Sequence, residues 1–447
     1  MSELPAGWTT APLGVIGSWG SGGTPSRGNS SYFEGNIPWA VIGDLKDGTL
    51  TSTQQKISKS GLENSSAKLV PADTLLVAMY GSIGKLAITG IECATNQAIA
   101  FCVPDTETIA LRYLFYSILQ SRDALNELGQ GAGQQNISQT ILKEFKIPLA
   151  PLAEQKRIAQ KLDALLAQVD TLKARIDAIP ALLKRFRQCV LQGASTGDLT
   201  ASWATKEGAS KWISLRFREL LKDFRGGASS RPSGETHGTP VLRSSAVRPM
   251  SVNFKDVSHF DESMTLNPND YALEGDLLFT RLSGSAEFVG VCGRVKATPR
   301  VPTQFPDRLF CARLIDIRYA PYLEIFFSSQ NYISHIGRNL KSSAGHQRIT
   351  TETVKNAEIR LPSLEEQTEI VRRVEQLFAY ADQLEAKVAA AQQRIDALTQ
   401  SLLAKAFRGE LVPQDPTDEP ASVLLERIRT QRAATPKPKR GRKAATS

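Results

Sequence analysis

Residues 152–176 read LAEQKRIAQKLDALLAQVDTLKARI, and residues 364–388 read LEEQTEIVRRVEQLFAYADQLEAKV. Both stretches belong to a longer repeat, Gly133 to Leu199 and Gly345 to Leu411, which aligns without a gap at an offset of 212 positions. Each copy reads as a loop, a short strand and a long amphipathic helix. The repeat therefore predicts a chain built from two equivalent halves.

The helical part of each copy carries apolar residues at alternating spacings of four and three, which is the heptad pattern of a coiled coil. In the first copy this seam comprises Ile158, Leu162, Leu165, Val169, Leu172, Ile176, Ile179, Leu183, Phe186 and Val190. In the second copy it comprises Ile370, Val374, Leu377, Ala381, Leu384, Val388, Ala391, Ile395, Leu398 and Leu402. Because the two helices match in length and phase, we expect them to pair in antiparallel orientation, with a pseudo-twofold symmetry.

Outside the helices, short apolar runs alternate with clusters of Gly, Ser, Asn and Pro, a texture typical of short strands joined by turns. We therefore expect an α+β chain with two strand-rich domains, whose shared framework and divergent loops suit two sites that read different ligands. The predicted segments are a first domain at 1–150, a first spacer helix at 151–194, a second domain at 205–361, a second spacer helix at 362–408 and a C-terminal tail at 412–447.

The net charge of +9 favours a polyanionic partner, and nucleic acid is the leading candidate. Part of this charge lies in the tail, whose end we expect to be disordered and able to contact phosphates without reading sequence. The tail cations are Lys437, Lys439, Arg440, Arg442 and Lys443.

The five cysteines are scattered and form no Cys-x-x-Cys motif, as in a reduced compartment. The N-terminus has no signal pattern, and no apolar run reaches the length of about 18 residues that a membrane span needs. These features predict a cytoplasmic protein with no membrane partner.

Motifs of common enzyme classes are absent from the sequence. The segment Gly81 to Lys85 has neither the spacing nor the terminal hydroxyl residue of a phosphate-binding loop, and there is no nucleophile elbow, zinc-protease helix or dinucleotide fingerprint. The Asp/Asn-Pro-Pro-aromatic element of amino-methyltransferases is also missing, and the four histidines are isolated. We therefore predict a non-catalytic binding protein with no metal and no cofactor of its own.

Two motifs precede each long helix. The first is Gly-x-Gln-x-Ile, at 133–137 and 345–349, and the second is a Leu-x-Glu-Gln segment after a proline, at 152–155 and 364–367. Together with two variable domains, these motifs make nearly the whole chain resemble the specificity (S) subunit of type I restriction-modification enzymes.

The resemblance implies a DNA-recognition subunit whose two target recognition domains each read one half of a bipartite, asymmetric site. The spacer helices would set the gap between the halves and dock two methyltransferase (M) subunits, and restriction (R) subunits would join them. These partners would carry out adenine methylation and cleavage, with S-adenosylmethionine, ATP and Mg bound in them. The alternative, from the coiled-coil pattern alone, is a non-catalytic adaptor whose end domains bind proteins.

Polar loop residues are the candidate DNA contacts. Arg and Lys can bond guanine N7 and O6, Asn and Gln can bond adenine N6 and N7, and hydroxyls can hold phosphates. The candidates in the first half are Thr24, Ser26, Arg27, Lys46, Tyr80, Ser82, Lys85, Asn96, Gln97, Gln134, Gln135 and Asn136. Those in the second half are Arg243, Ser244, Arg281, Ser283, Arg308, His346, Gln347 and Arg348. Each could instead be an ordinary solvated loop residue, and the repeated Gly-x-Gln-x-Ile loop could be a structural turn.

Overall fold

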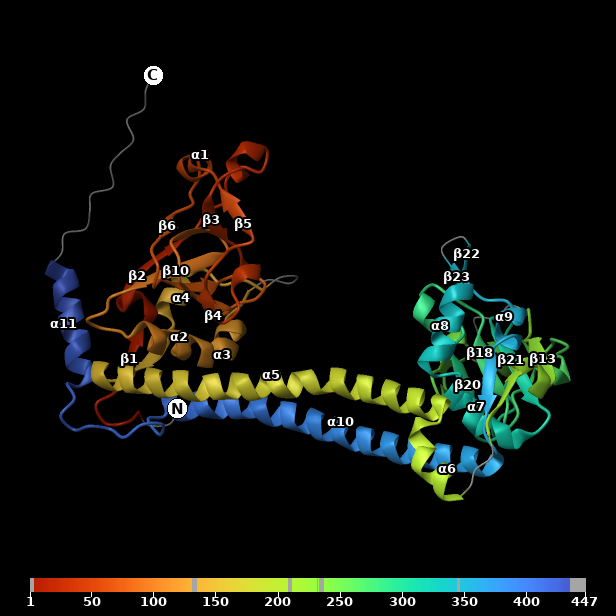
Figure 1. The fold of residues 1–447 in the computed structure, drawn as a ribbon. Coiled ribbons are helices and arrows are strands. Elements are labelled where there is room, and N and C mark those ends of the chain that lie inside the picture. Colours follow the sequence, from red (N-terminus) through yellow and green to blue (C-terminus); the bar gives the residue numbers. More distant parts are fainter. Residues whose placement is uncertain are drawn as a thin grey trace. The chain divides into compact units, whose positions relative to one another are not determined.

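A computed structural model describes residues 4–130, 135–207, 211–230, 232, 237–343 and 346–434. The chain forms two compact units, Met1–Ile176 with Ala391–Ser447, and Asp177–Ala390 (Figure 1). Each unit contains one strand-rich domain and half of each of the two long helices, α5 (Leu152–Thr196) and α10 (Leu364–Phe407). The predicted α+β class, with strand-rich domains and a pair of long helices, is confirmed.

The first unit is built on a five-stranded sheet of order β2-β10-β7-β8-β4, a four-stranded sheet of order β5-β3-β9-β6 and the pair β1-β11. Its strands are β1 (Thr9–Pro12), β2 (Gly17–Ser21), β3 (Ile37–Ala40), β4 (Gly48–Leu50), β5 (Gln55–Ile57), β6 (Leu69–Val70), β7 (Leu75–Ala78), β8 (Leu86–Thr89), β9 (Cys93–Thr95), β10 (Ile99–Pro104) and β11 (Lys146–Leu149). Its shorter helices are α1 (Lys59–Glu63), α2 (Leu111–Gln120), α3 (Arg122–Glu127), α4 (Gln139–Glu144) and α11 (Ala421–Ala434).

The second unit is built on a four-stranded sheet of order β13-β21-β18-β20 and the pair β12-β24. Its strands are β12 (Ile213–Arg216), β13 (Leu221–Gly226), β14 (Thr239–Leu242), β15 (Val247–Arg248), β16 (Ser251–Val252), β17 (Val257–Phe260), β18 (Leu277–Thr280), β19 (Leu282–Ser283), β20 (Cys292–Arg294), β21 (Leu309–Leu314), β22 (Lys341–Ser343), β23 (His346–Arg348) and β24 (Glu358–Leu361). Its shorter helices are α6 (Ala201–Glu207), α7 (Ala320–Phe326), α8 (Gln330–Asn339) and α9 (Thr351–Lys355).

The strand order shows the internal equivalence of the two units. The run β13-β21-β18-β20 repeats β2-β10-β7-β8, and β12-β24 repeats β1-β11. The central strands β7 and β18 are buried along their whole length, as expected for runs of apolar residues in the middle of a sheet. Removing each large apolar side chain from water contributes about 1.5–3 kcal/mol.

The long helices run antiparallel within each unit. In the first unit, Lys173 of α5 donates to Asp396 of α10 at 2.8 Å. In the second, Arg187 of α5 contacts Asp382 and Glu385 of α10 at 2.5 and 2.7 Å. Residues later in α5 therefore contact residues earlier in α10, as in an antiparallel pair.

The heptad seam is buried at ten of its predicted positions, namely Ile158, Leu162, Val169, Leu183, Val190, Ile370, Val374, Ala381, Val388 and Ile395. The prediction is wrong at Leu172 and Leu398, whose exposed fractions are 49% and 45%. Two helices bury only the stripe where they touch, so apolar residues beside that stripe remain in solvent.

A glycine in the left-handed region follows each long helix within two residues, Gly197 with φ +92° and Gly409 with φ +73°. This conformation satisfies carbonyls at the end of a helix and strains residues that carry a Cβ. A second shared feature lies before the helices, where Ser138 and Thr350 cap the short helices α4 and α9 by accepting a backbone N–H. These short helices were not predicted.

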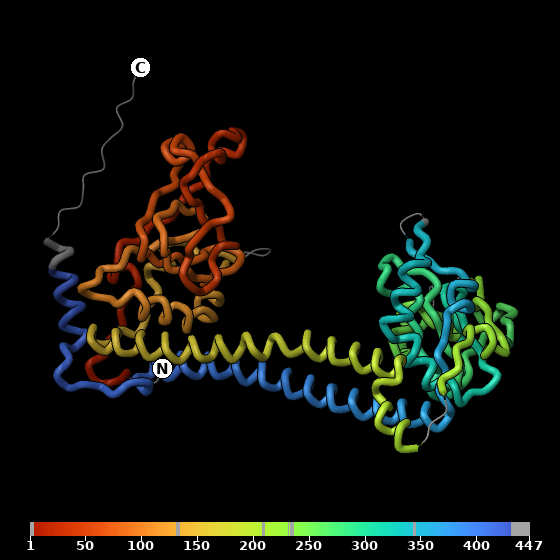
Figure 2. Tube along the Cα trace, in the orientation of Figure 1, coloured from red at the N-terminus to blue at the C-terminus, as the bar shows by residue number. Residues whose placement is uncertain are grey.

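Helix α11 was not predicted either, because the sequence analysis assigned 412–447 to a tail. Leu424, Leu425 and Ile428 are buried in the core of the first unit, and Ala421 N donates to the Gly7 carbonyl at 2.9 Å. Figure 2 shows α11 beside the N-terminal segment of this unit. The basic residues at 437–443 lie outside the described residues.

Candidate nucleic-acid interface

A small three-stranded sheet gathers the candidate residues of the second unit. In this sheet β23 lies between β19 and β22. The Ile349 backbone N–H donates to the Arg281 carbonyl at 3.0 Å, and the Arg281 N–H donates to the Arg308 carbonyl at 2.8 Å. Three segments that are distant in the sequence therefore meet at one place.

A surface hollow of about 780 Å³ opens beside this sheet, and hydroxyl and cationic side chains are prominent in its lining. The predicted residues that line it are Arg243, Ser244, Arg308, His346 and Arg348. The other predicted residues, Arg281, Ser283 and Gln347, lie on or next to the paired strands β19 and β23. All predicted contacts of the second unit thus lie in one region.

The four arginines of this region differ in their partners. Arg243 donates to Ser258 Oγ at 3.0 Å and lies 3.7 Å from the Asp256 carboxylate. Arg281 donates to the Asp307 carbonyl at 3.2 Å. Among the described residues, no ion pair or side-chain hydrogen bond holds the other two guanidinium groups, those of Arg308 and Arg348. Two arginines are therefore anchored by the protein, and two remain available to a ligand.

The candidates of the first unit fall into separate groups. One group surrounds Asn136, which forms β-bridges with Tyr80 and with Gln130, and includes Gln135, whose carbonyl accepts from Gly81 N at 3.1 Å. Ser82 and Lys85 lie in the same turn, since Lys85 N donates to the Ser82 carbonyl at 3.1 Å. Gln134 lies outside the described residues.

A second group joins Thr24 to Gln97 by a hydrogen bond between their side chains. The neighbouring Asn96 accepts from Ala98 N at 3.2 Å, so its side chain stabilises the turn before β10. Ser26 and Arg27 are exposed on the loop that follows Thr24. Lys46 stands apart from both groups, in a depression of about 200 Å³ with Asp44 and Gln54.

The hairpin beside the hollow has an equivalent in the first unit. At the repeat offset, Arg348 corresponds to Asn136 and Gln347 to Gln135. Arg348 pairs with residues on both sides of it, and Asn136 does the same. The same backbone arrangement therefore presents different side chains in the two units.

Comparisons with known proteins agree with this architecture. The family model "Type I restriction modification DNA specificity domain" matches residues 5–181 and 301–391. The chain is 38% identical over 461 residues to the type I restriction enzyme EcoKI specificity subunit of Escherichia coli (strain K12), with 99% of each chain covered. The chain belongs to this family of type I specificity subunits. The subunit is therefore a DNA-recognition component of a restriction-modification complex and is not itself the catalyst.

Solved structures support the fold of this specificity subunit. A chain from a study titled "Structural basis underlying complex assembly and conformational transition of the type I R-M system" superposes with a TM-score of 0.63 at 18% identity, covering 92% of this chain and all of that one. The HsdS subunit from Thermoanaerobacter tengcongensis superposes with a TM-score of 0.54 at 19% identity, covering 91% of this chain and 98% of that one.

No helix in the described part of the specificity subunit is long and apolar enough to cross a bilayer. Among the same residues, no group of three or more His, Cys, Asp or Glu side chains is arranged to hold a metal ion.

The sequence analysis missed the polar contacts that attach each domain to its long helix. Trp8 Nε1 donates to Glu154 Oε2 at 2.9 Å, and Trp212 Nε1 donates to Glu366 Oε2 at 2.9 Å. Both carboxylates are almost fully buried. The repeated Glu-Gln pair and the tryptophan near the start of each domain were visible in the sequence, and their contact was not.

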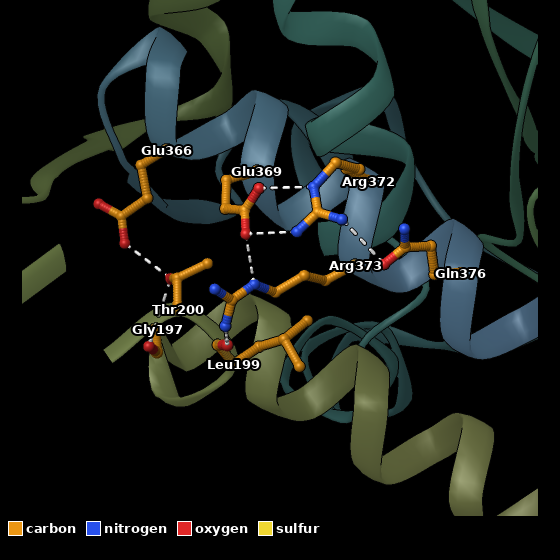
Figure 3. A network of polar contacts seen from close by, with 8 residues as sticks. All are labelled: Gly197, Leu199, Thr200, Glu366, Glu369, Arg372, Arg373 and Gln376. Atoms are coloured by element: carbon orange, nitrogen blue, oxygen red, sulfur yellow. Dashed lines mark hydrogen bonds and ion pairs between the residues drawn. The ribbon is translucent and has the colours of Figure 1, made fainter. Parts of the chain in front are cut away.

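The second-unit junction contains additional bonds, which Figure 3 shows. Thr200 Oγ1 donates to Glu366 Oε1 at 2.8 Å, and Arg373 Nη1 donates to the Leu199 carbonyl at 2.7 Å. Arg373 Nε also donates to Glu369 at 2.6 Å. The turn that follows α5, at Leu199 and Thr200, is thereby held against the start of α10.

Glu369 has a second cationic partner, Arg372, which donates two hydrogen bonds of 2.7 Å to its carboxylate. The bonds from Arg372 and Arg373 lower the pKa of Glu369 to about 2. The carboxylate therefore stays charged and keeps both arginines in place at neutral pH.

The first-unit junction lacks the threonine–glutamate contact. Thr200 is replaced by Val412 at the repeat offset, and Glu154 Oε1 is buried with no hydrogen-bond partner in the described part of the chain. Burial raises the pKa of Glu154 above its usual value, against a smaller lowering effect of the Trp8 hydrogen bond. The tryptophan–glutamate bond is therefore common to both junctions, whereas the threonine–glutamate bond occurs only in the second.

Proposed function

We propose that the chain reads two half-sites of one asymmetric, double-stranded DNA target, one with each unit. The observation that carries this proposal is the repeated hairpin, which carries Gln135 and Asn136 in one unit and Gln347 and Arg348 in the other. Equal scaffolds with unequal side chains suit two readers of different base sequences. The domains at 1–150 and 205–361 would make these contacts through the loop residues identified above.

The continuous helices α5 and α10 would set the unread gap between the half-sites and dock the partner subunits. Support for docking comes from Leu172 and Leu398, which are large, apolar and about half exposed beside the Lys173–Asp396 pair. Contiguous exposed apolar surface marks protein interfaces, and these two leucines would contribute to such a surface. The partners would be two M subunits and R subunits in the bacterial cytoplasm, which would bind S-adenosylmethionine, ATP and Mg for adenine methylation and cleavage.

Methylome sequencing tests the recognition proposal directly. Cells that carry the chain with its M subunits should show methylated adenines within a gapped motif, and cells without the chain should lack that motif. A continuous motif, or methylation that persists without the chain, would contradict the proposal.

Co-purification tests the docking proposal. Replacing both Leu172 and Leu398 with Asp should abolish co-purification of the M subunits, because charged residues would disrupt an apolar interface. Thr171→Asp, at an exposed position of the same helix, is the matched control. Full retention of the M subunits by the double variant would exclude this surface.

A further inference from the structure

The arginines in and beside the hollow of the second unit are of two kinds: some are held by contacts within the protein, and others are available to a ligand. Arg281 is fixed on two sides, because it donates to the Asp307 carbonyl and its guanidinium carbon lies 5.7 Å from the centre of the Phe310 ring. Arg243 is fixed by Ser258 and Asp256. Arg308 and Arg348 are exposed and have neither kind of restraint among the described residues. An exposed guanidinium without a protein partner keeps all five of its N–H donors for a ligand.

The strand geometry decides which residues of β23 face the hollow. Side chains alternate between the two faces of a strand, so His346 and Arg348 share one face and Gln347 takes the other. In agreement, His346 and Arg348 line the hollow, and Gln347 is not part of the lining. Arg348 is thus presented from a paired strand of a hairpin, on the same side as Arg308.

A hairpin that carries an arginine matches the major groove of DNA in both shape and chemistry. The groove admits a two-stranded β-ribbon, and an arginine fork bonds N7 and O6 of guanine together. Phosphate oxygens can also accept the two bonds of an arginine fork, but hydroxyl groups can hold phosphates as well, whereas only a base edge carries sequence information. The hollow supplies such a hydroxyl from Ser244, whereas the Ser245 hydroxyl donates to the Asp256 carboxylate at 2.5 Å.

We propose that Arg308 and Arg348 are specificity-determining residues that read guanines in the half-site recognised by the second unit. Ser244 positions the phosphate backbone beside them, and Arg243 and Arg281 support the hairpin without reading bases. The proposal rests on the proposed function, since it assigns base identity within one of the two half-sites.

The test uses the complex of the full chain with its M subunits. Binding of Arg308→Ala and Arg348→Ala complexes is measured on duplexes in which each base pair of the second half-site is changed in turn, at several salt concentrations. Each variant should lose discrimination at one G·C pair by about tenfold to a hundredfold, with the first half-site read as before. The dependence of affinity on salt should keep its slope. Arg348→Lys, which keeps the charge and lacks the planar fork, should also discriminate less well.

Arg318→Ala is the matched control, because Arg318 is an exposed arginine of the same unit that is paired with Asp316 and lies outside the lining of the hollow. It should leave affinity and discrimination unchanged. The proposal is overturned if the alanine variants weaken binding to all duplexes equally and reduce the salt slope by about one, which is the signature of a phosphate contact. It is also overturned if the second half-site contains no guanine. Failure of the proposed function would differ from both results, since the wild-type complex itself would then show no gapped target.

Discussion

Val412 stands in the first unit where Thr200 stands in the second, and this difference leaves Glu154 Oε1 without a hydrogen bond among the described residues. We expect Val412→Thr to stabilise the first unit by about 1 kcal/mol, the net value of one intramolecular hydrogen bond. The reverse change, Thr200→Val, should destabilise the second unit by about 1–3 kcal/mol, because it leaves a buried carboxylate oxygen unpaired. Calorimetric unfolding measures both changes. Equal transitions in wild type and Thr200→Val would show that the Thr200–Glu366 hydrogen bond does not stabilise the second unit.

Glu154 should also make the first unit sensitive to pH. Its pKa is raised by burial, so the folded state binds the proton more tightly than the unfolded state does. The resulting stabilisation is complete below the ordinary pKa of 4.5 and is lost as the pH rises through the higher pKa of the folded state. Glu154→Gln keeps an oxygen that can accept from Trp8 and removes the charge.

The variant should therefore unfold at higher denaturant concentration than wild type at pH 7, and the difference should shrink as the pH falls toward 5. Urea titrations at a series of pH values, followed by a signal from the first unit, measure this difference. A difference that stays constant across the series would show that Glu154 does not titrate in this window.

At the scale of elements, α11 is a structural helix of the first unit. Leu424 is 3% exposed and Val423 is 49% exposed on the same helix, so the two positions form a matched pair. Leu424→Ala should destabilise the first unit by about 2–5 kcal/mol, the usual cost of removing a buried leucine side chain. Val423→Ala should change its stability by less than about 0.5 kcal/mol. Similar effects of the two substitutions on thermal unfolding would mean that α11 does not pack in solution as it does in the structure.

At the scale of the whole molecule, the two compact units have separate hydrophobic cores. The second core is centred on aromatic residues, where the Phe279 ring lies 4.9 Å from that of Phe327 and 6.0 Å from that of Phe217. Phe279→Ala should lower the stability of the second unit by about 3–5 kcal/mol. Because chains with two cores often unfold in more than one step, calorimetry should show one transition shifted and the other unchanged. A common shift of both transitions would show that the units unfold together.

The repeat and the family motifs are visible in the sequence itself, and the two long helices could be predicted from it. Heptads and motif spacings are local patterns that can be recognised without knowledge of the fold. The second-unit candidates were selected by residue type alone, and in the structure they lie in the lining of one hollow or on or next to the strands beside it. The first-unit candidates followed the same reasoning and fall into separate groups, because loop residues of similar type can lie on different sides of one domain.

Other features depended on contacts between distant segments. Examples are the packing of α11 in the first core and the bonds from Trp8 and Trp212 to the long helices. Another is the backbone link from Arg308 through Arg281 to the end of β23. No local periodicity in the sequence connects the residues of these pairs. The residues that make these contacts are visible in the sequence, but only the folded structure determines which of them pair with one another. Periodicity specifies which face of an element is apolar, whereas tertiary packing decides which polar groups that face brings together.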